Sequence, residues 1–202
     1  MTEPNYSYHL VNTNDHEAIS KIIELHIESF PDGIMNQLGA TYIHHYYKAL
    51  IESKQSGVIV CKHNNSTVGY IGFTVNHSSP EMKQLKKKIN ARLWFRLFTF
   101  RLNPIAVLRA LIKKWKAKPV QCLPELTAFS VNKNHRRMGI GRMLVCELEK
   151  ILIDSNQTEY IVFTDNEEGL RFYQKEQFET IFQFQLFETI SACFKKTIKR
   201  NE

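Results

Sequence analysis

The chain reads Glu125-Leu-Thr-Ala-Phe-Ser-Val131, then Asn132 to His135, then Arg136-Arg-Met-Gly-Ile-Gly141, and ends this stretch with the amphipathic run 142–153. The first segment has the apolar character of a short strand, and the last has helical spacing. The first turn of a helix has N–H groups without intrahelical acceptors, and these add to the positive end of the macrodipole. Strand, glycine loop and helix in this order therefore predict a site for a phosphate or pyrophosphate.

Two glycines in this loop suit such a site. Gly139 and Gly141 lack a Cβ atom, so a ligand can approach the backbone and the turn can take a positive φ. Arg136 and Arg137 add positive charge at the same place. No Gly-Lys-Ser/Thr follows, which excludes a Walker loop, and the third glycine of a dinucleotide fingerprint is absent. A tight turn that uses glycine only for packing is the alternative.

The loop resembles the acetyl-CoA signature of the GNAT superfamily of N-acetyltransferases, Gln/Arg-x-x-Gly-x-Gly/Ala, with Arg136, Gly139 and Gly141 in the defining places. A second segment resembles the family's Asn…(Leu/Phe)-Tyr-x-Lys-x-Gly-Phe pattern: strand 160–164, Asn166 and then 170–178. The similarity covers about 124–187, roughly a third of the chain. Gln177 stands where the family usually has glycine, so we expect a wider turn there, or one reached without a positive φ.

The resemblance implies an α/β fold, with a mixed central sheet of about seven strands that is flanked by helices and splayed between strands 4 and 5. It implies one N-acetyltransferase domain over 1–202, with a basic helical insertion at about 78–120 between strands 3 and 4. Periodicity and turn signals predict strands at 6–11, 57–63, 67–75, 125–131, 160–164, 179–187 and 190–198. They predict one helix that starts at Asn14 or Asp15, three helices over 36–53, 82–100 and 104–115, one helix after Gly141 and one after Asn166.

The resemblance also implies a set of donor-binding residues for acetyl-CoA. The backbone of Phe129, Ser130 and Val131 would contact the pantetheine arm in the opening between strands 4 and 5. Asn166 matches a position whose side chain helps to hold that arm. The pyrophosphate would be enclosed by the loop and the first helical turn, namely Arg136, Arg137, Met138, Gly139, Ile140, Gly141 and Arg142.

Two residues match catalytic positions of the family. An alkylammonium with a pKa near 10.4 cannot attack a thioester until it loses a proton. Glu125, six residues before Val131, resembles the glutamate that serves as general base; a salt bridge to a basic neighbour is the alternative. Tyr173 matches the tyrosine that protonates the departing sulfur, and core packing is its alternative. The run 44–47 (His-His-Tyr-Tyr) either borders the acceptor site or packs against the sheet.

Composition limits the class of protein. The chain has 202 residues, 43% of them hydrophobic, which suits a single domain with a sizeable core. Four scattered cysteines form no Cys-x-x-Cys pair and predict neither a disulfide framework nor a metal site. No signal peptide and no apolar stretch of about 20 residues are evident. A reducing cytoplasm fits these features best.

The positive charge is concentrated in one segment. The net charge is +7, yet Asn76 to Pro119 holds twelve Lys or Arg against one acid, so the rest of the chain is net negative. The insertion is interpreted first as a helical cap over the active site. Its 83–118 segment could instead contact an anionic membrane surface from the cytoplasm or recognise a phosphorylated acceptor. Nucleic acid is the least favoured partner.

We therefore predict an acetyl-CoA-dependent N-acetyltransferase that acts on a primary amine of a small molecule and needs no metal. The Phe30-Pro-x-Gly turn, the predicted helical segment 38–50 and the long basic insertion together resemble bacterial members associated with surface-polysaccharide synthesis, which favours an amino sugar on a nucleotide or lipid carrier. Acetylation of a protein, peptide or polyamine is an alternative. A non-catalytic module that binds CoA or a membrane surface is another. A homodimer is compatible with each.

Overall fold

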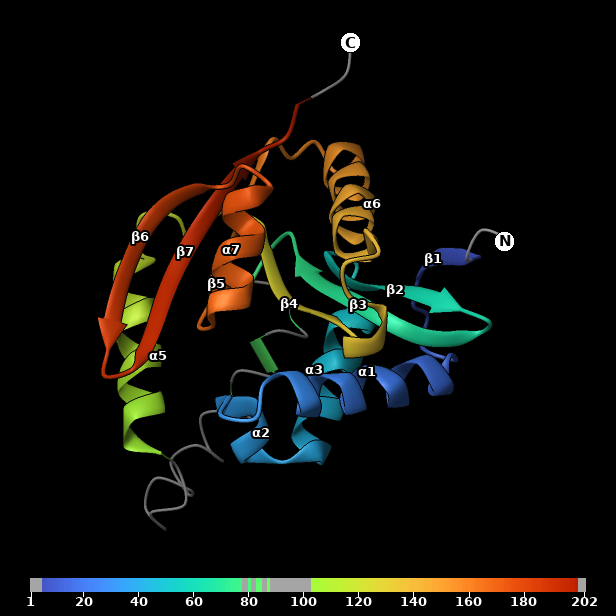
Figure 1. Ribbon diagram of the computed structural model, residues 1–202, viewed down its shortest axis with the longest axis horizontal. Coiled ribbons are helices and arrows are strands. Elements are labelled where there is room, and N and C mark those ends of the chain that lie inside the picture. The colour runs from blue at the N-terminus through green and yellow to red at the C-terminus, as the bar shows by residue number, and fades with distance from the viewer. Residues whose placement is uncertain (1–4, 78–79, 81–82, 85–86, 88–102, 200–202) are drawn as a thin grey trace.

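A mixed β-sheet forms the centre of the computed structural model, which describes residues 5–77, 80, 83–84, 87 and 103–199 (Figure 1). In this part of the chain the sheet has seven strands in the order β1-β2-β3-β4-β5-β7-β6. The strands are β1 (Tyr6–Leu10), β2 (Ser56–His63), β3 (Ser66–Thr74), β4 (Glu125–Val131), β5 (Glu159–Thr164), β6 (Glu179–Leu186) and β7 (Thr189–Thr197). Strands β4 and β5 run parallel, and the other neighbours run antiparallel. The predicted α/β sheet is confirmed.

The helices are α1 (His16–Ser29), α2 (Ile34–Leu38), α3 (Ala40–Glu52), α5 (Pro104–Lys116), α6 (Ile140–Asp154) and α7 (Glu167–Lys175), with a 3₁₀ turn at Lys133–His135. Asp15 caps α1 by accepting a hydrogen bond from the amide of Ala18, as the sequence predicted. The single helix predicted over 36–53 is wrong. Gly39, with φ 97° and ψ 162°, lies between α2 and α3 and breaks the helical path, because no helix continues through that conformation.

Helices cover both faces of the sheet (Figure 1). On one face α6 and α7 pack against alternate residues of the strands, among them Ile71, Leu126 and Phe194. On the other face α1 and α3 pack against Tyr70 and Ala128, among others. Neighbouring residues of one strand thus enter different cores, as the two-residue period of a strand requires.

Strands β4 and β5 separate after a short contact. Only Glu125 with Ile161 and Leu126 with Val162 pair between them. The amide of Asn132 bonds to the carbonyl of Val68, on the β3 side of β4. Because pairing alternates along an antiparallel strand, the backbone groups of Phe129 and Val131 face the gap instead. The predicted splaying is present.

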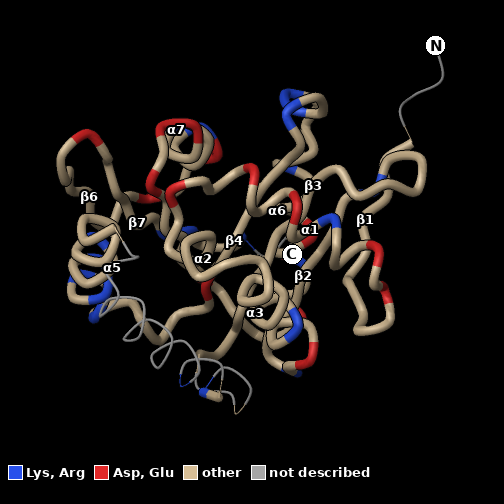
Figure 2. The backbone as a smooth tube through the Cα atoms, turned by 90° about the horizontal axis from the view of Figure 1, so that it is seen from below, with Lys and Arg blue, Asp and Glu red and all other residues tan. Residues whose placement is uncertain are grey.

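The segment before β4 is described only in part. The predicted helix 82–100 falls almost wholly outside the described residues, and α5 is confirmed over Pro104–Lys116. Helix α5 lies beside β6, where the ammonium of Lys116 stands 5.9 Å from the ring centre of Phe182. Figure 2 shows Lys and Arg gathered along α5.

The turn after α7 corrects one expectation. Gln177 takes a φ of 60°, so the positive φ is kept although glycine is missing. The amide of Phe178 bonds to the carbonyl of Tyr173, which closes the helix in the manner that needs a left-handed residue. A non-glycine residue in that conformation costs about 1–2 kcal/mol.

Candidate active site

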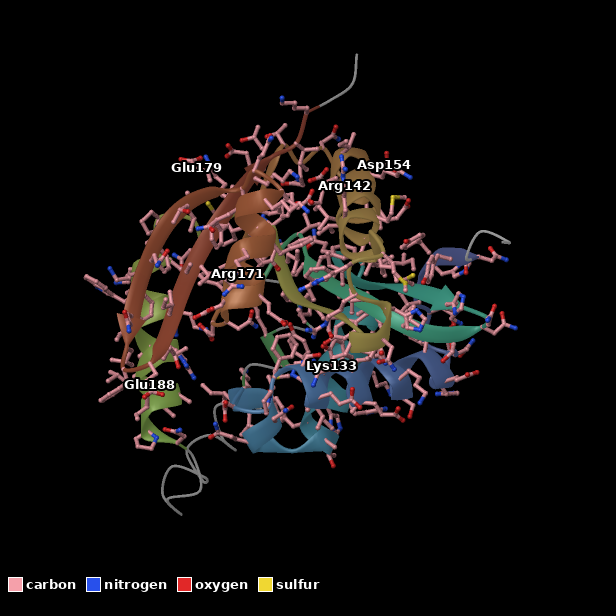
Figure 3. The ribbon with its side chains drawn as sticks, in the orientation of Figure 1. Lys133, Arg142, Asp154, Arg171, Glu179 and Glu188 are labelled. Atoms are coloured by element: carbon pink, nitrogen blue, oxygen red, sulfur yellow. The ribbon has the colours of Figure 1, made fainter. Side chains whose placement is uncertain are left out.

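One cleft of about 2300 Å³ runs along the gap between β4 and β5. Its walls are the α1–α2 loop, β4, the loop before α6, the start of α7, the β6–β7 turn and one face of α5. Figure 3 labels Lys133 in the loop before α6, Arg142 in the first turn of α6, Arg171 on α7 and Glu188 in the β6–β7 turn, all of which line the cleft. The cleft brings together twelve of the thirteen predicted site residues: Glu125, Phe129, Ser130, Val131, Arg136, Arg137, Gly139, Ile140, Gly141, Arg142, Asn166 and Tyr173.

Met138 is the predicted residue that the cleft does not include. Its side chain is exposed, and its sulfur accepts a hydrogen bond from the Tyr6 hydroxyl at 3.1 Å. The side chain therefore lies against β1, on the outside of the loop.

The two loop glycines serve different purposes. Gly139 precedes α6 with φ 80° and ψ −7°, and a Cβ there would meet no atom within 4 Å. A Cβ on Gly141 would lie 3.0 Å from the Phe129 ring and 3.2 Å from the Phe172 ring. Gly139 thus provides the backbone conformation, and Gly141 permits close packing. No side chain of the described residues caps α6, which leaves its first amides directed at the cleft.

The three arginines near this loop differ in their contacts. The Nε of Arg136 donates to the Val131 carbonyl at 3.1 Å, and its Nη1 lies 2.6 Å from a carboxylate oxygen of Glu168 on α7. Arg136 therefore ties the end of β4 to α7 across the gap. Arg142 has a long contact with Glu176, at 3.9 Å. Arg137 makes no hydrogen bond or ion pair with another described residue, and its φ is 61°.

The start of α7 carries two polar residues of the cleft. The Oδ1 of Asn166 caps the helix by accepting a hydrogen bond from the amide of Gly169 at 2.6 Å. Asp165 accepts a hydrogen bond from Ser191 at 2.7 Å and pairs with Lys113 of α5 at 2.6 Å. This contact between α5 and the end of β5 was not predicted from the sequence, because it joins residues 52 positions apart.

Glu125 lies at the start of β4 with its side chain about one-fifth exposed. One of its carboxylate oxygens is 3.1 Å from the Nε2 of His77, which also lines the cleft. Sequence reasoning missed His77. No local pattern signalled this contact, because it follows from the antiparallel register that pairs Thr74 with Glu125 and places the residues after β3 beside the start of β4.

Tyr173 combines a buried ring with a hydroxyl that bonds to none of the described residues. The ring packs against Phe178 and Phe194, with centroids 5.1 and 5.7 Å apart, and the residue lines the cleft. Its hydroxyl makes no hydrogen bond with another described residue. Burial raises the pKa of Tyr173 well above its ordinary value, so the phenol keeps its proton at neutral pH.

A buried polar cluster supports the floor of the site. His26 Nδ1 lies 2.7 Å from the Tyr47 hydroxyl, which donates to Tyr70 at 2.9 Å. Burial lowers the pKa of His26 to about 4, so the imidazole is neutral at pH 7. None of the described residues 44–47 lines the cleft, and Tyr47 is fully buried, so the packing alternative holds for it. Ser130, whose backbone faces β3, shares a 2.6 Å hydrogen bond with Ser29.

Among the described residues, no group of three or more His, Cys, Asp or Glu side chains is arranged to hold a metal ion. The four cysteines are free. In the same residues we find no helix with the length and apolarity required to cross a membrane.

The model of the acetyltransferase (GNAT) family matches residues 19–178. No curated protein sequence matches the chain. Similar structures include agmatine N-acetyltransferase, at 10% identity and a TM-score of 0.69, with 96% of this chain and 100% of that one covered.

Two further structures contain the donor or its product. Aminoglycoside 6'-N-acetyltransferase complexed with coenzyme A has 12% identity and a TM-score of 0.63, with 97% and 99% of the chains covered. The yncA protein of Salmonella typhimurium, solved with its cofactor acetyl-CoA, has 13% identity and a TM-score of 0.59, with 98% and 96% covered. At these identities the likeness shows the fold.

Proposed function

The chain belongs to the GNAT family of acetyltransferases, and from that premise we propose that it transfers the acetyl group of acetyl-CoA to a primary amine of a small molecule. The observation that carries the proposal is the gap beside β4, which opens onto the uncapped amides of α6 and holds a carboxylate at its other end. Our best candidate for the acceptor is an amino sugar on a nucleotide or lipid carrier.

The donor would bind as an additional strand. The backbone groups of Phe129 and the amide of Val131 face the gap and can exchange hydrogen bonds with the pantetheine amides, while the Val131 carbonyl already accepts from Arg136. The pyrophosphate would lie on the first amides of α6 beyond Gly139, where an anion is favoured by the helix dipole and by Arg137, which pairs with no described residue. The amide group of Asn166 would add a side-chain contact, since only its oxygen is used as the cap.

The acceptor nitrogen would lose a proton to Glu125, whose carboxylate is oriented by His77. The free amine then attacks the thioester carbon, the C–N bond forms and the C–S bond breaks. The nitrogen releases its second proton to solvent and the sulfur takes one from Tyr173. The Tyr173 phenolate then regains a proton from solvent, so protons balance over the step. A thiol pKa near 8.5 makes this donation helpful and not indispensable.

Two proteins with similar structures are named for the small amines that they acetylate, agmatine and aminoglycosides. This supports a small-molecule acceptor. Among the alternatives, a cationic polyamine is disfavoured because Arg109, Lys113 and Lys114 line the cleft. Proteins and peptides remain the second candidate.

An acceptor screen tests the proposal. We expect acetyl-CoA turnover, measured as release of free CoA thiol with mass identification of the product, to be fastest with amino sugars on carriers. Free amino sugars, peptides and polyamines serve as comparisons. Calorimetry on folded protein is expected to detect binding of both acetyl-CoA and CoA. If neither ligand produces heat, the proposed donor site is wrong. If peptides are the preferred acceptors, the proposed small-molecule acceptor is wrong.

We also propose that α5 contacts an anionic membrane surface. This helix has an apolar row that is not packed inward: Leu108, Leu111 and Trp115 are 47%, 59% and 66% exposed. The same helix carries four basic residues and no acid. An apolar row flanked by Lys and Arg is the pattern of a helix that lies in the lipid interface.

The double variant Leu111→Ser/Trp115→Ser tests this contact. Sedimentation with vesicles of phosphatidylglycerol and phosphatidylcholine is expected to show about a tenfold weaker partition than the wild type, because two interfacial side chains are lost. Leu10→Ser, at an equally exposed leucine on β1, is the control and should partition as the wild type does. Equal binding to neutral vesicles, or no binding at low salt, would contradict the proposal.

The cytoplasmic location, the single domain over 1–202 and a homodimer stay predictions.

A further inference from the structure

One face of α5 belongs to the cleft. Ile105, Arg109, Lys113 and Ala117 follow one another at intervals of four residues, and all four line the cleft, together with Lys114. This spacing places them on one side of the helix, which is not the side that carries the exposed apolar row of Leu108, Leu111 and Trp115. The insertion therefore presents a cationic wall to the same space that contains Glu125.

The cations on this face do not have the same partners. Lys113 is neutralised by Asp165 at 2.6 Å, and the other oxygen of Asp165 is taken by Ser191. Arg109 and Lys114 make no hydrogen bond or ion pair with any other residue that the structure describes. Arg109 is nonetheless partly buried.

The acids of the cleft do not compensate these two charges. Five of these acids have another partner: Glu125 with His77, Glu168 with Arg136, Glu167 with Arg171, Glu176 with Arg142, and Asp165 with Lys113. The other three that line the cleft, Glu28, Asp32 and Glu188, form no ion pair with Arg109, Lys114 or any other described residue. A guanidinium is permanently charged, and its planar fork matches the oxygens of a phosphate. A partly buried arginine without an internal anion is thus best explained by an anion that arrives with a ligand.

The donor does not supply that anion in our assignment. Its pyrophosphate would lie at the Val131 end of β4, beyond Gly139, whereas Glu125 stands at the other end of this strand, about 20 Å away in an extended chain. The C-terminal end of α5 is connected to Glu125 through 117–124, and Ala117 and Gln121 of this connection line the cleft. The face of α5 thus flanks the space in which the acceptor amine has to reach Glu125.

We propose that Arg109 and Lys114, with Lys113 held beside them, form a subsite for a phosphate group of the acceptor. The subsite narrows the acceptor to phosphorylated amines, either a phosphate monoester or a sugar attached through a diphosphate. It rests on the proposed acetyl transfer for its role in catalysis, but its affinity for phosphate does not depend on turnover.

The matched pair glucosamine and glucosamine 6-phosphate, which differ only in the phosphate, tests the subsite together with a UDP-linked amino sugar. In the wild type, kcat/KM is expected to be higher for a phosphorylated acceptor than for glucosamine. Arg109→Gln is expected to lower kcat/KM for the phosphorylated acceptor about tenfold to a hundredfold, the range of a lost charge-assisted contact. Its kcat/KM for glucosamine and its affinity for CoA should stay at the wild-type level. Lys118→Gln, a lysine that follows α5 and does not line the cleft, is the control.

Calorimetry without CoA separates the subsite from the reaction. Binding of glucosamine 6-phosphate or the UDP-linked sugar that is lost in Arg109→Gln and largely restored in Arg109→Lys supports the subsite even if no acetyl transfer is found. Turnover with no preference for phosphorylated acceptors would overturn the subsite and leave the acetyltransferase intact. Preference for muramic acid, an amino sugar that carries a carboxylate on a lactyl ether and no phosphate, would overturn the phosphate assignment. Equal affinity of wild type and Arg109→Gln would do the same.

Discussion

Replacing Glu125 by glutamine is expected to lower kcat/KM for the acceptor about a hundredfold to a thousandfold at pH 7, with little change in CoA affinity. The amide keeps the size of the side chain but cannot accept the ammonium proton. The deficit should shrink as the pH rises toward 10, because solvent then deprotonates a growing fraction of the amine. Initial rates from pH 7 to 10, with Kd for CoA from calorimetry, measure both effects.

Two further variants serve as a control and a comparison for Glu125→Gln. Glu188→Gln removes another carboxylate that lines the cleft, on the β6–β7 turn, and should leave kcat/KM near the wild-type value. Tyr173→Phe should lower kcat about tenfold, a smaller loss, because a CoA thiolate can leave without a proton. If Glu125→Gln loses turnover and CoA affinity to the same degree, the carboxylate supports the site and is not the base.

Gly139→Val is expected to raise Kd for CoA at least about a hundredfold while the protein still folds. At φ 80° a β-branched residue is strongly disfavoured, by about 1–3 kcal/mol or more, so the loop has to move. Its amides and those of the first turn of α6 then no longer converge on one anion. A Cβ at this position meets no neighbour within 4 Å, so the core itself is not disturbed. Calorimetry with CoA and a thermal melt measure the two consequences.

Gly39→Val is the matched control. Gly39 also has a positive φ, 97°, and a Cβ there would likewise meet no atom within 4 Å, but it lies between α2 and α3 and does not line the cleft. With ψ 162° Gly39 has a conformation that only glycine adopts readily, so Gly39→Val should lose at least as much stability as Gly139→Val, and only Gly139→Val should lose CoA. Normal CoA binding by Gly139→Val would remove this loop from the donor site. A similar loss of CoA in both would attribute the effect to the fold.

Much of the fold was predictable because its signals are local. A cap at Asp15, a glycine before α6 and apolar alternation in β4 each depend on residues within a turn or a strand. The break at Gly39 was missed because the apolar period continues through it, and periodicity does not report a single residue that leaves the helix. The same limit explains Gln177, whose left-handed conformation closes α7 despite its side chain.

The sequence by itself determined the order of the elements, the family resemblance and the residues of the loop before α6, since each follows from contiguous residues and their backbone preferences. Only the tertiary structure decided which side chains meet. Sheet register brings His77 to Glu125, and the docking of α5 brings Lys113 to Asp165 while it turns Leu111 and Trp115 outward. Such contacts depend on the packing of segments far apart in the chain, which no local pattern records.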